Sequence, residues 1–205
     1  GFAFGFHRAL DNAGAVAGGL TAAAILAWSD LSLSEVIMWS AVPGFVAVLL
    51  LGAGVKVEPN SIESAPVRTL PPLRWSALSL PMQHYLWVLM LFTFARASET
   101  FILLLGHQLG IGVVELLLLW SALNLAKALT STQGGQLADR FGHGSLIVIG
   151  WSSLALAFLA LSQVTHSSEL WLVSIGYGLL IGMSEGAERA LISDYAHVNE
   201  RGTAF

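Results

Sequence analysis

Apolar residues run along this chain in long stretches, which short polar turns and one proline-rich segment separate. Six stretches are long enough to cross a bilayer, because a spanning helix needs about 20 mostly apolar residues. They do not alternate apolar with polar residues as barrel strands do, so helices are the expected spanning elements. The predicted spans cover residues 9–28, 34–52, 83–106, 111–130, 145–163 and 169–190. The pattern therefore predicts an all-α, polytopic membrane bundle of about six transmembrane helices.

Residues 53–82 break this pattern with prolines and polar side chains, and we interpret them as a cytoplasmic linker. Two predicted spans precede the linker and four follow it. The opening residues 1–4 (GFAF) recur as GTAF at residues 202–205, which favours one period cut from a tandem repeat of six-helix bundles. We therefore assign residues 1–52 to the end of a first half and residues 83–205 to the first four helices of a second half. About four further helices are expected before the chain and two after it.

Positive charges fall on one side of the predicted spans. The turns at 29–35, 107–110 and 164–168 contain no lysine or arginine. The flanking positive charges are Arg8, Lys56, Arg68, Arg74, Lys127, Arg140, Arg189 and Arg201. The positive-inside rule makes their side cytoplasmic, so both ends of the chain are expected in the cytoplasm and the protein in the cell membrane.

Composition narrows the function. Hydrophobic residues make up 55% of the chain and charged residues only 11%, whereas soluble domains carry about 25% charged residues. A soluble enzyme and a disordered chain are therefore excluded. A net charge of -4 without a basic run gives no nucleic-acid surface, and the bilayer is the expected partner. With no cysteine, no histidine pair at ligand spacing and no phosphate-binding loop, we expect no enzyme activity, cofactor or metal.

Residues 134–144 (GGQLADRFGHG) resemble a cytoplasmic signature, G-x-L-a-D-R-x-G-r-r, of the major facilitator superfamily of secondary transporters. The signature lies in the predicted turn between the fourth and fifth spans. The matching positions are Gly135, Leu137, Ala138, Asp139, Arg140 and Gly142, while His143 and Gly144 replace the usual basic pair. The first span resembles the family's fifth helix with its G-x-x-x-G-P pattern, in which Gly14 and Gly18 fit and Gly19 replaces the proline.

The resemblance covers the whole chain as helices five to ten of twelve. It implies a transporter that moves a small solute by alternating access, that is monomeric when full length, and whose seventh helix lines a central cavity. The absent nucleotide-binding loop favours an ion gradient, and hence a proton, as the source of energy. The alternative is a membrane enzyme or a non-transporting membrane subunit, which would use the same buried charges for chemistry or assembly.

Arg96 and Glu99 are the candidate transport site. Arg96 follows Gln83 by about 20 Å of helix, which places the pair inside the hydrocarbon. Charges at that depth mark ion or substrate pathways, and a spacing of three puts both on one helix face. A carboxyl group beside a cation in a low-dielectric cavity can load and release a proton. The alternative is a neutral pair that only packs against another helix.

Small polar side chains are further candidates for lining the cavity or for satisfying helix contacts. They are Ser121, Asn124, Ser174, Tyr177 and Ser184. Gly14 and Gly18 form a G-x-x-x-G face that is expected to pack closely against another helix.

The resemblance also implies a cytoplasmic gate at the signature. Asp139 would interact with the positive N-terminal end of a neighbouring helix, and Arg140 would pair with an acidic residue, either Glu185 or Glu188. Arg189 is expected beside them, although Glu188 and Arg189 are equally explained as interfacial anchors. The pair Arg8 and Asp11 is interpreted as interfacial, with side chains that reach the water.

Overall fold

The part of the chain that the structure describes is helical throughout. The computed structural model describes residues 2–54, 79–95 and 99–195, without the side chains of residues 95, 189 and 192–195. Its helices are α1 (Phe2–Trp28), α2 (Leu33–Trp39), α3 (Ala41–Gly54), α4 (Leu80–Ala95), α5 (Thr100–Gln108), α6 (Val113–Phe141), α7 (His143–Leu161) and α8 (Ser167–Tyr195). Within these described ranges, five stretches are long and apolar enough to cross a membrane: α1, α2 with α3, α6, α7 and the part of α8 to Glu188. The predicted all-α membrane fold is confirmed.

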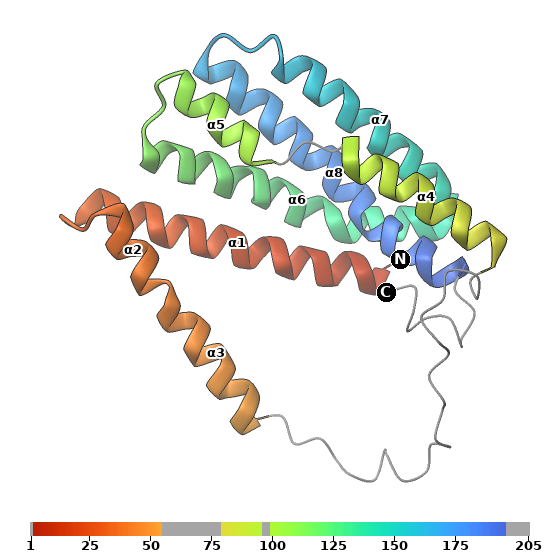
Figure 1. Cartoon of the computed structure of the whole chain (residues 1–205), viewed down its shortest axis with the longest axis horizontal. Helices are drawn as coiled ribbons and strands as arrows, with labels where there is room; N and C mark the ends of the chain where they lie inside the picture. Colours follow the sequence, from red (N-terminus) through yellow and green to blue (C-terminus); the bar gives the residue numbers. More distant parts are fainter. Residues whose placement is uncertain (1, 55–78, 96–98, 196–205) are drawn as a thin grey trace.

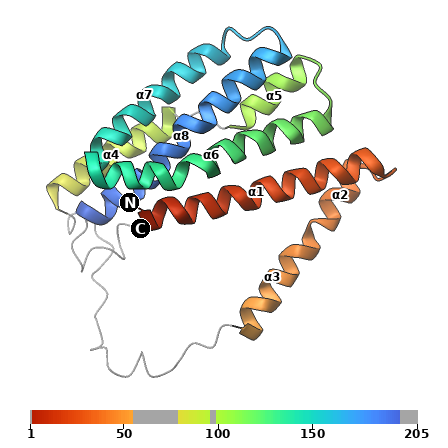
Figure 2. The same ribbon diagram turned by 180° about the vertical axis from the view of Figure 1, so that it is seen from behind.

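Helices α6 and α8 form the centre of the bundle, with α7 against α8 and α1 along α6 (Figures 1 and 2). Their shared core includes Leu119, Leu123, Leu170 and Ile181, which are almost fully buried. The starts of α1, α4 and α7 lie at one end of the bundle, together with the end of α6 (Figure 1). Helices α1, α4 and α7 therefore run in the direction opposite to α6.

The second predicted span is divided at Ser40 into α2 and α3. Helix α2 begins with a capping box, in which the Ser32 backbone N–H donates to Glu35 Oε2 at 2.7 Å and the Ser32 hydroxyl accepts from the Glu35 N–H. A proline ring conflicts with the carbonyl four residues earlier, so Pro43 disfavours one continuous helix through Trp39. In the first turn of α3 the same proline is tolerated.

The third predicted span, residues 83–106, corresponds to two helices. Helix α4 ends at Ala95 and α5 begins at Thr100, with Glu99 at the N-terminal cap of α5. Residues 96–98 lie outside the described ranges, as does most of the predicted linker at 53–82. This span therefore does not appear among the long apolar helices of the described residues.

Helix α6 continues well beyond the predicted end of its span at residue 130. The signature residues Gly135, Asp139 and Arg140 therefore lie in the last turns of a helix, where a turn was predicted. The turn itself is at Gly142, whose φ of 89° is in the region that favours glycine. Gly134 does not end the helix because its missing side chain is needed for packing: a Cβ there would lie 2.2 Å from the backbone oxygen of Met183 in α8.

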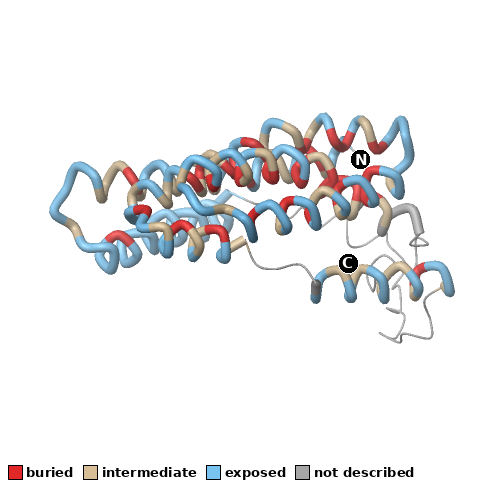
Figure 3. The backbone as a smooth tube through the Cα atoms, turned by 90° about the horizontal axis from the view of Figure 1, so that it is seen from above, coloured by how far each residue is buried: buried red, intermediate tan, exposed pale blue. Residues whose placement is uncertain are grey.

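Burial is concentrated where α6, α7 and α8 meet, and the outer faces are exposed and apolar (Figure 3). Helix α3 has no buried residue, and Phe45 and Leu49 are each 70% exposed. Apolar outer faces of this kind suit a chain surrounded by lipid.

Candidate functional site

A buried lysine lies at the centre of the charged residues. Lys127 is at the midpoint of α6, about 21 Å from either end of the helix, and only 4% of it is exposed. Its ammonium group contacts Glu99 Oε1 and lies 5.8 Å from the centre of the Tyr177 ring. The Tyr177 hydroxyl donates to the same Glu99 oxygen at 2.8 Å. Three elements thus bring Glu99, Lys127 and Tyr177 together.

Further charged side chains lie between Lys127 and the start of α1. Lys127 Nζ lies 3.9 Å from Glu185 Oε1, and Arg8 Nε lies 3.9 Å from Glu185 Oε2. Arg8 also lies 3.9 Å from Asp11, which His7 approaches at 3.3 Å. Opposite charges therefore alternate from Glu99 to Asp11 across α6, α8 and α1. We call Glu99, Lys127, Glu185 and Arg8 the charged chain.

Close helix packing surrounds Lys127. A Cβ on Gly182 of α8 would lie 2.7 Å from the Lys127 carbonyl oxygen, so the two backbones meet at the lysine. The Ser131 hydroxyl donates to that carbonyl oxygen at 2.7 Å. Removing ions from water costs several kcal/mol each, which only well-placed opposite charges offset. The charges of Lys127 and Glu185 are consequently tied to their partners.

The residues that are predicted to line the cavity differ in their hydrogen-bond partners. Tyr177 is the predicted residue that reaches Glu99. The side chains of Ser121, Asn124 and Ser184 donate to backbone oxygens of their own helices, at 2.8, 2.8 and 3.1 Å. These three hydrogen bonds therefore lie within single helices. Ser174 is fully buried, and its hydroxyl has no hydrogen-bond partner among the described residues.

The predicted pairing of Arg96 with Glu99 involves a residue outside the described part of the chain. Among the described residues, Lys127 is a cation that contacts Glu99. The sequence pattern predicts Lys127 to be a cytoplasmic flanking charge, close to the predicted end of its span at residue 130. The helix continues to Phe141, so the lysine lies at mid-helix. Extending the apolar pattern through the paired glycines Gly134 and Gly135 would have indicated this position.

At the cytoplasmic signature, the Phe2 backbone N–H of α1 donates to Asp139 Oδ2 at 3.1 Å, and His143 Nε2 lies 3.4 Å from Asp139 Oδ1. Gly135 is buried, and a Cβ on Gly186 of α8 would lie 3.8 Å from its Cα atom. Gly142 forms the turn into α7. The structure therefore places Asp139 beside the first turn of α1.

Arg140 does not form the predicted pair. It is exposed and has no ion pair with a described residue. Glu185 instead faces Lys127 and Arg8, and Glu188 accepts a hydrogen bond from Trp151 Nε1 at 2.8 Å. The side chain of Arg189 is outside the described part of the chain. Arg140 lies on α6 roughly three and a half turns beyond Lys127.

Helix α1 packs through residues other than the predicted glycine pair. A Cβ on Gly14 or Gly18 would meet no described atom within 4 Å. A Cβ on Gly5 would lie 2.4 Å from the Ser131 carbonyl oxygen, and one on Gly19 would lie 2.3 Å from the Ser121 hydroxyl oxygen. The close contact of α1 with α6 is therefore on another face, and Gly14 and Gly18 are exposed.

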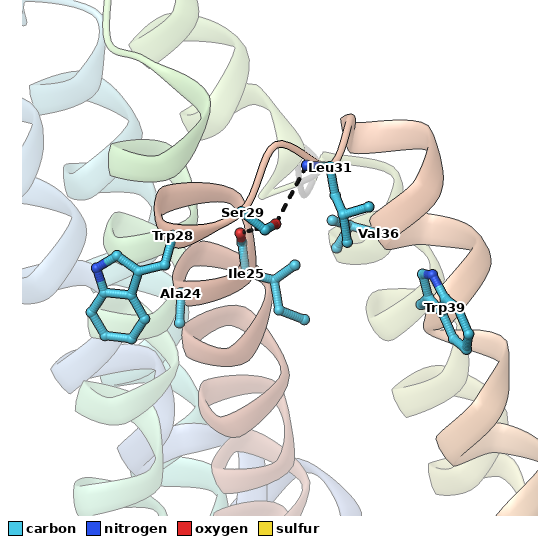
Figure 4. Close-up of a pocket in the computed structure, with 7 residues that line it drawn as sticks. All are labelled: Ala24, Ile25, Trp28, Ser29, Leu31, Val36 and Trp39. Atoms are coloured by element: carbon cyan, nitrogen blue, oxygen red, sulfur yellow. Dashed lines mark hydrogen bonds between the residues drawn. The ribbon is translucent and has the colours of Figure 1, made fainter.

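An open hollow of about 480 Å³ lies between the end of α1 and α2 (Figure 4). None of the residues of the charged chain lines it. Its lining residues are Ala24, Ile25, Trp28, Ser29, Leu31, Val36 and Trp39. They include no titratable side chain. Among the described residues, no three His, Asp or Glu side chains are grouped to hold a metal ion. The charged chain is therefore the candidate functional site.

Comparisons with known proteins agree with this architecture. The family model of the Major Facilitator Superfamily matches residues 1–205. An uncharacterised MFS-type transporter of Methanocaldococcus jannaschii is 26% identical over the whole chain, which covers 52% of that protein. An uncharacterised protein of Mycobacterium bovis is 29% identical, with 51% of it covered. The chain thus spans about half the length of these curated relatives, and no solved structure matches it significantly. The chain belongs to the major facilitator superfamily and is part of a multi-pass membrane protein.

Proposed function

We propose that this chain is part of a secondary transporter that moves a small solute by alternating access, coupled to the movement of protons. The observation that carries the proposal is the buried contact between Glu99 and Lys127, supported by the Tyr177 hydroxyl. Ionisable groups inside a membrane protein are costly, and they mark ion and substrate pathways by default. Family membership supports transport in preference to the enzyme alternative.

Glu99 is the proposed proton carrier. Its carboxylate accepts from Tyr177 and pairs with Lys127, so the charged form is held by two partners on α8 and α6. Adding a proton removes the charge and weakens both interactions. A site of this kind changes its contacts when it loads a proton, which is the requirement for coupling proton movement to a conformational change.

The two halves of the proposed transporter meet within this chain. Residues 1–52 are assigned to the first half and residues 83–205 to the second, with 53–82 as the cytoplasmic linker. The contact between Phe2 and Asp139 then joins the halves at the cytoplasmic side, where the positive-inside rule places it. Such a contact would hold the outward-facing state closed on the inside.

Transport by the full-length protein in proteoliposomes tests the proposal. An imposed pH gradient and an internal pH dye would report proton movement while small metabolites and drugs are screened. The expected result is substrate-dependent proton movement, which Glu99→Gln abolishes. Glu115→Gln is the matched control, because Glu115 lies in the first turn of α6 near Trp171, away from the charged chain. Wild-type proton movement in Glu99→Gln would contradict the assignment of Glu99.

A further inference from the structure

We propose that Lys127 is a positioning residue that transmits the protonation of Glu99 to the contact between α1 and α8. The inference rests on the proposed function and concerns how the carboxyl group acts on the rest of the molecule. It starts from one ammonium group placed between two carboxylates. Lys127 Nζ contacts Glu99 Oε1 and stands 3.9 Å from Glu185 Oε1.

These two contacts are unequal. An ammonium and a carboxylate form a charge-assisted hydrogen bond at about 2.8 Å, so a displacement of about 1 Å would complete the bond from Lys127 to Glu185. The long, flexible side chain of lysine allows this movement without a shift of α6. Lys127 therefore has a second partner within reach of its present position.

Among the described residues, Glu185 is shared between two cations. One of its oxygens lies 3.9 Å from Lys127 Nζ and the other lies 3.9 Å from Arg8 Nε, so neither contact is a short hydrogen bond. Its side chain is only 8% exposed. A lysine that moves toward Glu185 therefore competes with Arg8 for the same carboxylate.

The burial of Lys127 determines which carboxylate its ammonium group approaches. An ammonium group with little access to water must keep an opposite charge beside it. When Glu99 takes up a proton it loses its charge, and Glu185 becomes the stronger partner of Lys127. Glu185 then holds Arg8 less strongly. The described titratable groups on this path are Glu99, Lys127, Tyr177, Glu185, Arg8, Asp11 and His7.

Loosening Arg8 affects a close contact between helices. A Cβ on Gly186 of α8 would lie 3.1 Å from the Cα atom of Gly5 in α1, so the two backbones nearly touch one turn away from Arg8. The Arg8 to Glu185 pair is the charged contact between α1 and α8 at this point. Its weakening would favour separation of α1 from α8 at the end where α1 begins.

Distance measurements between spin labels in the full-length protein test the inference. Ala3→Cys in α1 and Ser145→Cys in α7, which packs against α8, provide exposed sites for the labels. This chain contributes no native cysteine. Glu99→Gln imitates the protonated carboxyl group and should raise the population of long distances severalfold. The same substitution in a Lys127→Gln background should cause no further change. Lys127→Arg should restore the response.

A second variant keeps the test decisive if Lys127→Gln does not fold. Glu185→Gln leaves the lysine in place but removes its second partner, and it should also abolish the response to Glu99→Gln. Acidification should shift the wild-type distances as Glu99→Gln does, and should leave the Glu185→Gln distances unchanged. An equal severalfold response to Glu99→Gln with and without Lys127 or Glu185 would overturn the inference. Because no substrate or gradient is present, this result is independent of whether transport proves to be proton-coupled.

Discussion

The Tyr177 hydroxyl supports a carboxylate at a depth where little water is available to replace it. The hydroxyl donates to Glu99 Oε1 at 2.8 Å, on the same oxygen that Lys127 contacts. A hydrogen bond to a charged group contributes about 1.5–3 kcal/mol, more than one between neutral groups. The hydroxyl therefore contributes to the position of Glu99 as well as to its charge.

Tyr177→Phe should lower the rate of substrate transport about tenfold, because one hydrogen bond to a charged group is lost while the ring and its packing remain. Tyr85→Phe is the matched control, since the Tyr85 hydroxyl donates to the Glu188 backbone oxygen at 3.2 Å and not to Glu99. Initial uptake rates in proteoliposomes would measure both. Equal rates for the two variants would show that the Tyr177 hydroxyl has no part in transport.

Sequence patterns located one member of the site and misplaced another. Glu99 was identified because a charge far inside an apolar stretch is costly. Lys127 lies in a similar stretch, but the two glycines and polar residues that follow it imitate the end of a span. Whether a glycine ends a helix or packs inside one depends on its neighbours in space. At Gly134 the neighbour is the backbone of Met183, which no local pattern contains.

At the scale of helices, α6 and α8 are held together through glycines that allow their backbones to meet. Gly134→Ala places a methyl group 2.2 Å from the Met183 carbonyl oxygen, so the helices must move apart. We expect a loss of about 1–3 kcal/mol in the free energy of unfolding. Gly14→Ala is the control, because no described atom lies within 4 Å of the new methyl group.

Thermal unfolding of the purified full-length variants in detergent would compare these two alanines. The midpoint for Gly134→Ala should fall by several degrees, and the midpoint for Gly14→Ala should stay the same or rise. The opposite order would mean that the predicted G-x-x-x-G face of α1 packs more closely than the interface of α6 with α8.

Helices α6 and α1 are also joined by a polar contact at their ends. Asp139 accepts the Phe2 N–H in the first turn of α1, where the helix dipole favours a negative charge. Asp139→Asn removes that charge. A charge at a helix end contributes about 0.3–1 kcal/mol, so the substitution should shift the conformational equilibrium about two- to fivefold toward opening at this end. The accessibility of Ser145→Cys to a soluble thiol reagent would measure the shift.

Arg140→Gln provides the contrast for that experiment. Arg140 is exposed and pairs with no described residue, so its replacement should leave the accessibility unchanged. A larger effect from Arg140→Gln than from Asp139→Asn would favour the ion pair with Glu185 or Glu188 that the resemblance implied.

Local residues decide some helix boundaries, although the apolar pattern predicted residues 34–52 as one span. Pro43 and the Ser32 capping box account for the ends of α2 and the start of α3 once the structure shows the division. The end of α6 at Gly142 was less evident, since its φ of 89° becomes visible only in the structure. The pairing of Glu185 with Lys127 and Arg8 depends on three helices packing together, and spacing along one helix does not define it.

At the scale of the whole molecule, consecutive spanning helices run in opposite directions, and this determines which turns lie on the same side of the membrane. Helix α7 connects Ser145 at one end to Ser162 at the other, and both serines are exposed. The positive-inside rule predicts that the Ser145 end is cytoplasmic. A membrane-impermeant maleimide should therefore label Ser162→Cys in intact cells and Ser145→Cys only after the cells are opened. Labelling in the reverse order would invert the proposed orientation.

The chain spans about half the length of its curated relatives, and the outer faces of α1 and α3 are largely exposed and apolar. Fold class and family could be predicted from the apolar stretches and the signature at 134–144, since both are local patterns. The substrate could not, because a binding site formed by several helices depends on residues far apart in the sequence.

Substrate exchange and substrate accumulation by Glu99→Gln, compared in the same proteoliposomes, test the central claim most directly. Exchange between equal substrate concentrations needs the conformational cycle without net proton transfer, whereas accumulation driven by a pH gradient needs a proton carrier. We predict that Glu99→Gln retains exchange and loses accumulation. Accumulation at the wild-type level in Glu99→Gln would contradict the assignment of the coupled proton to this carboxyl group.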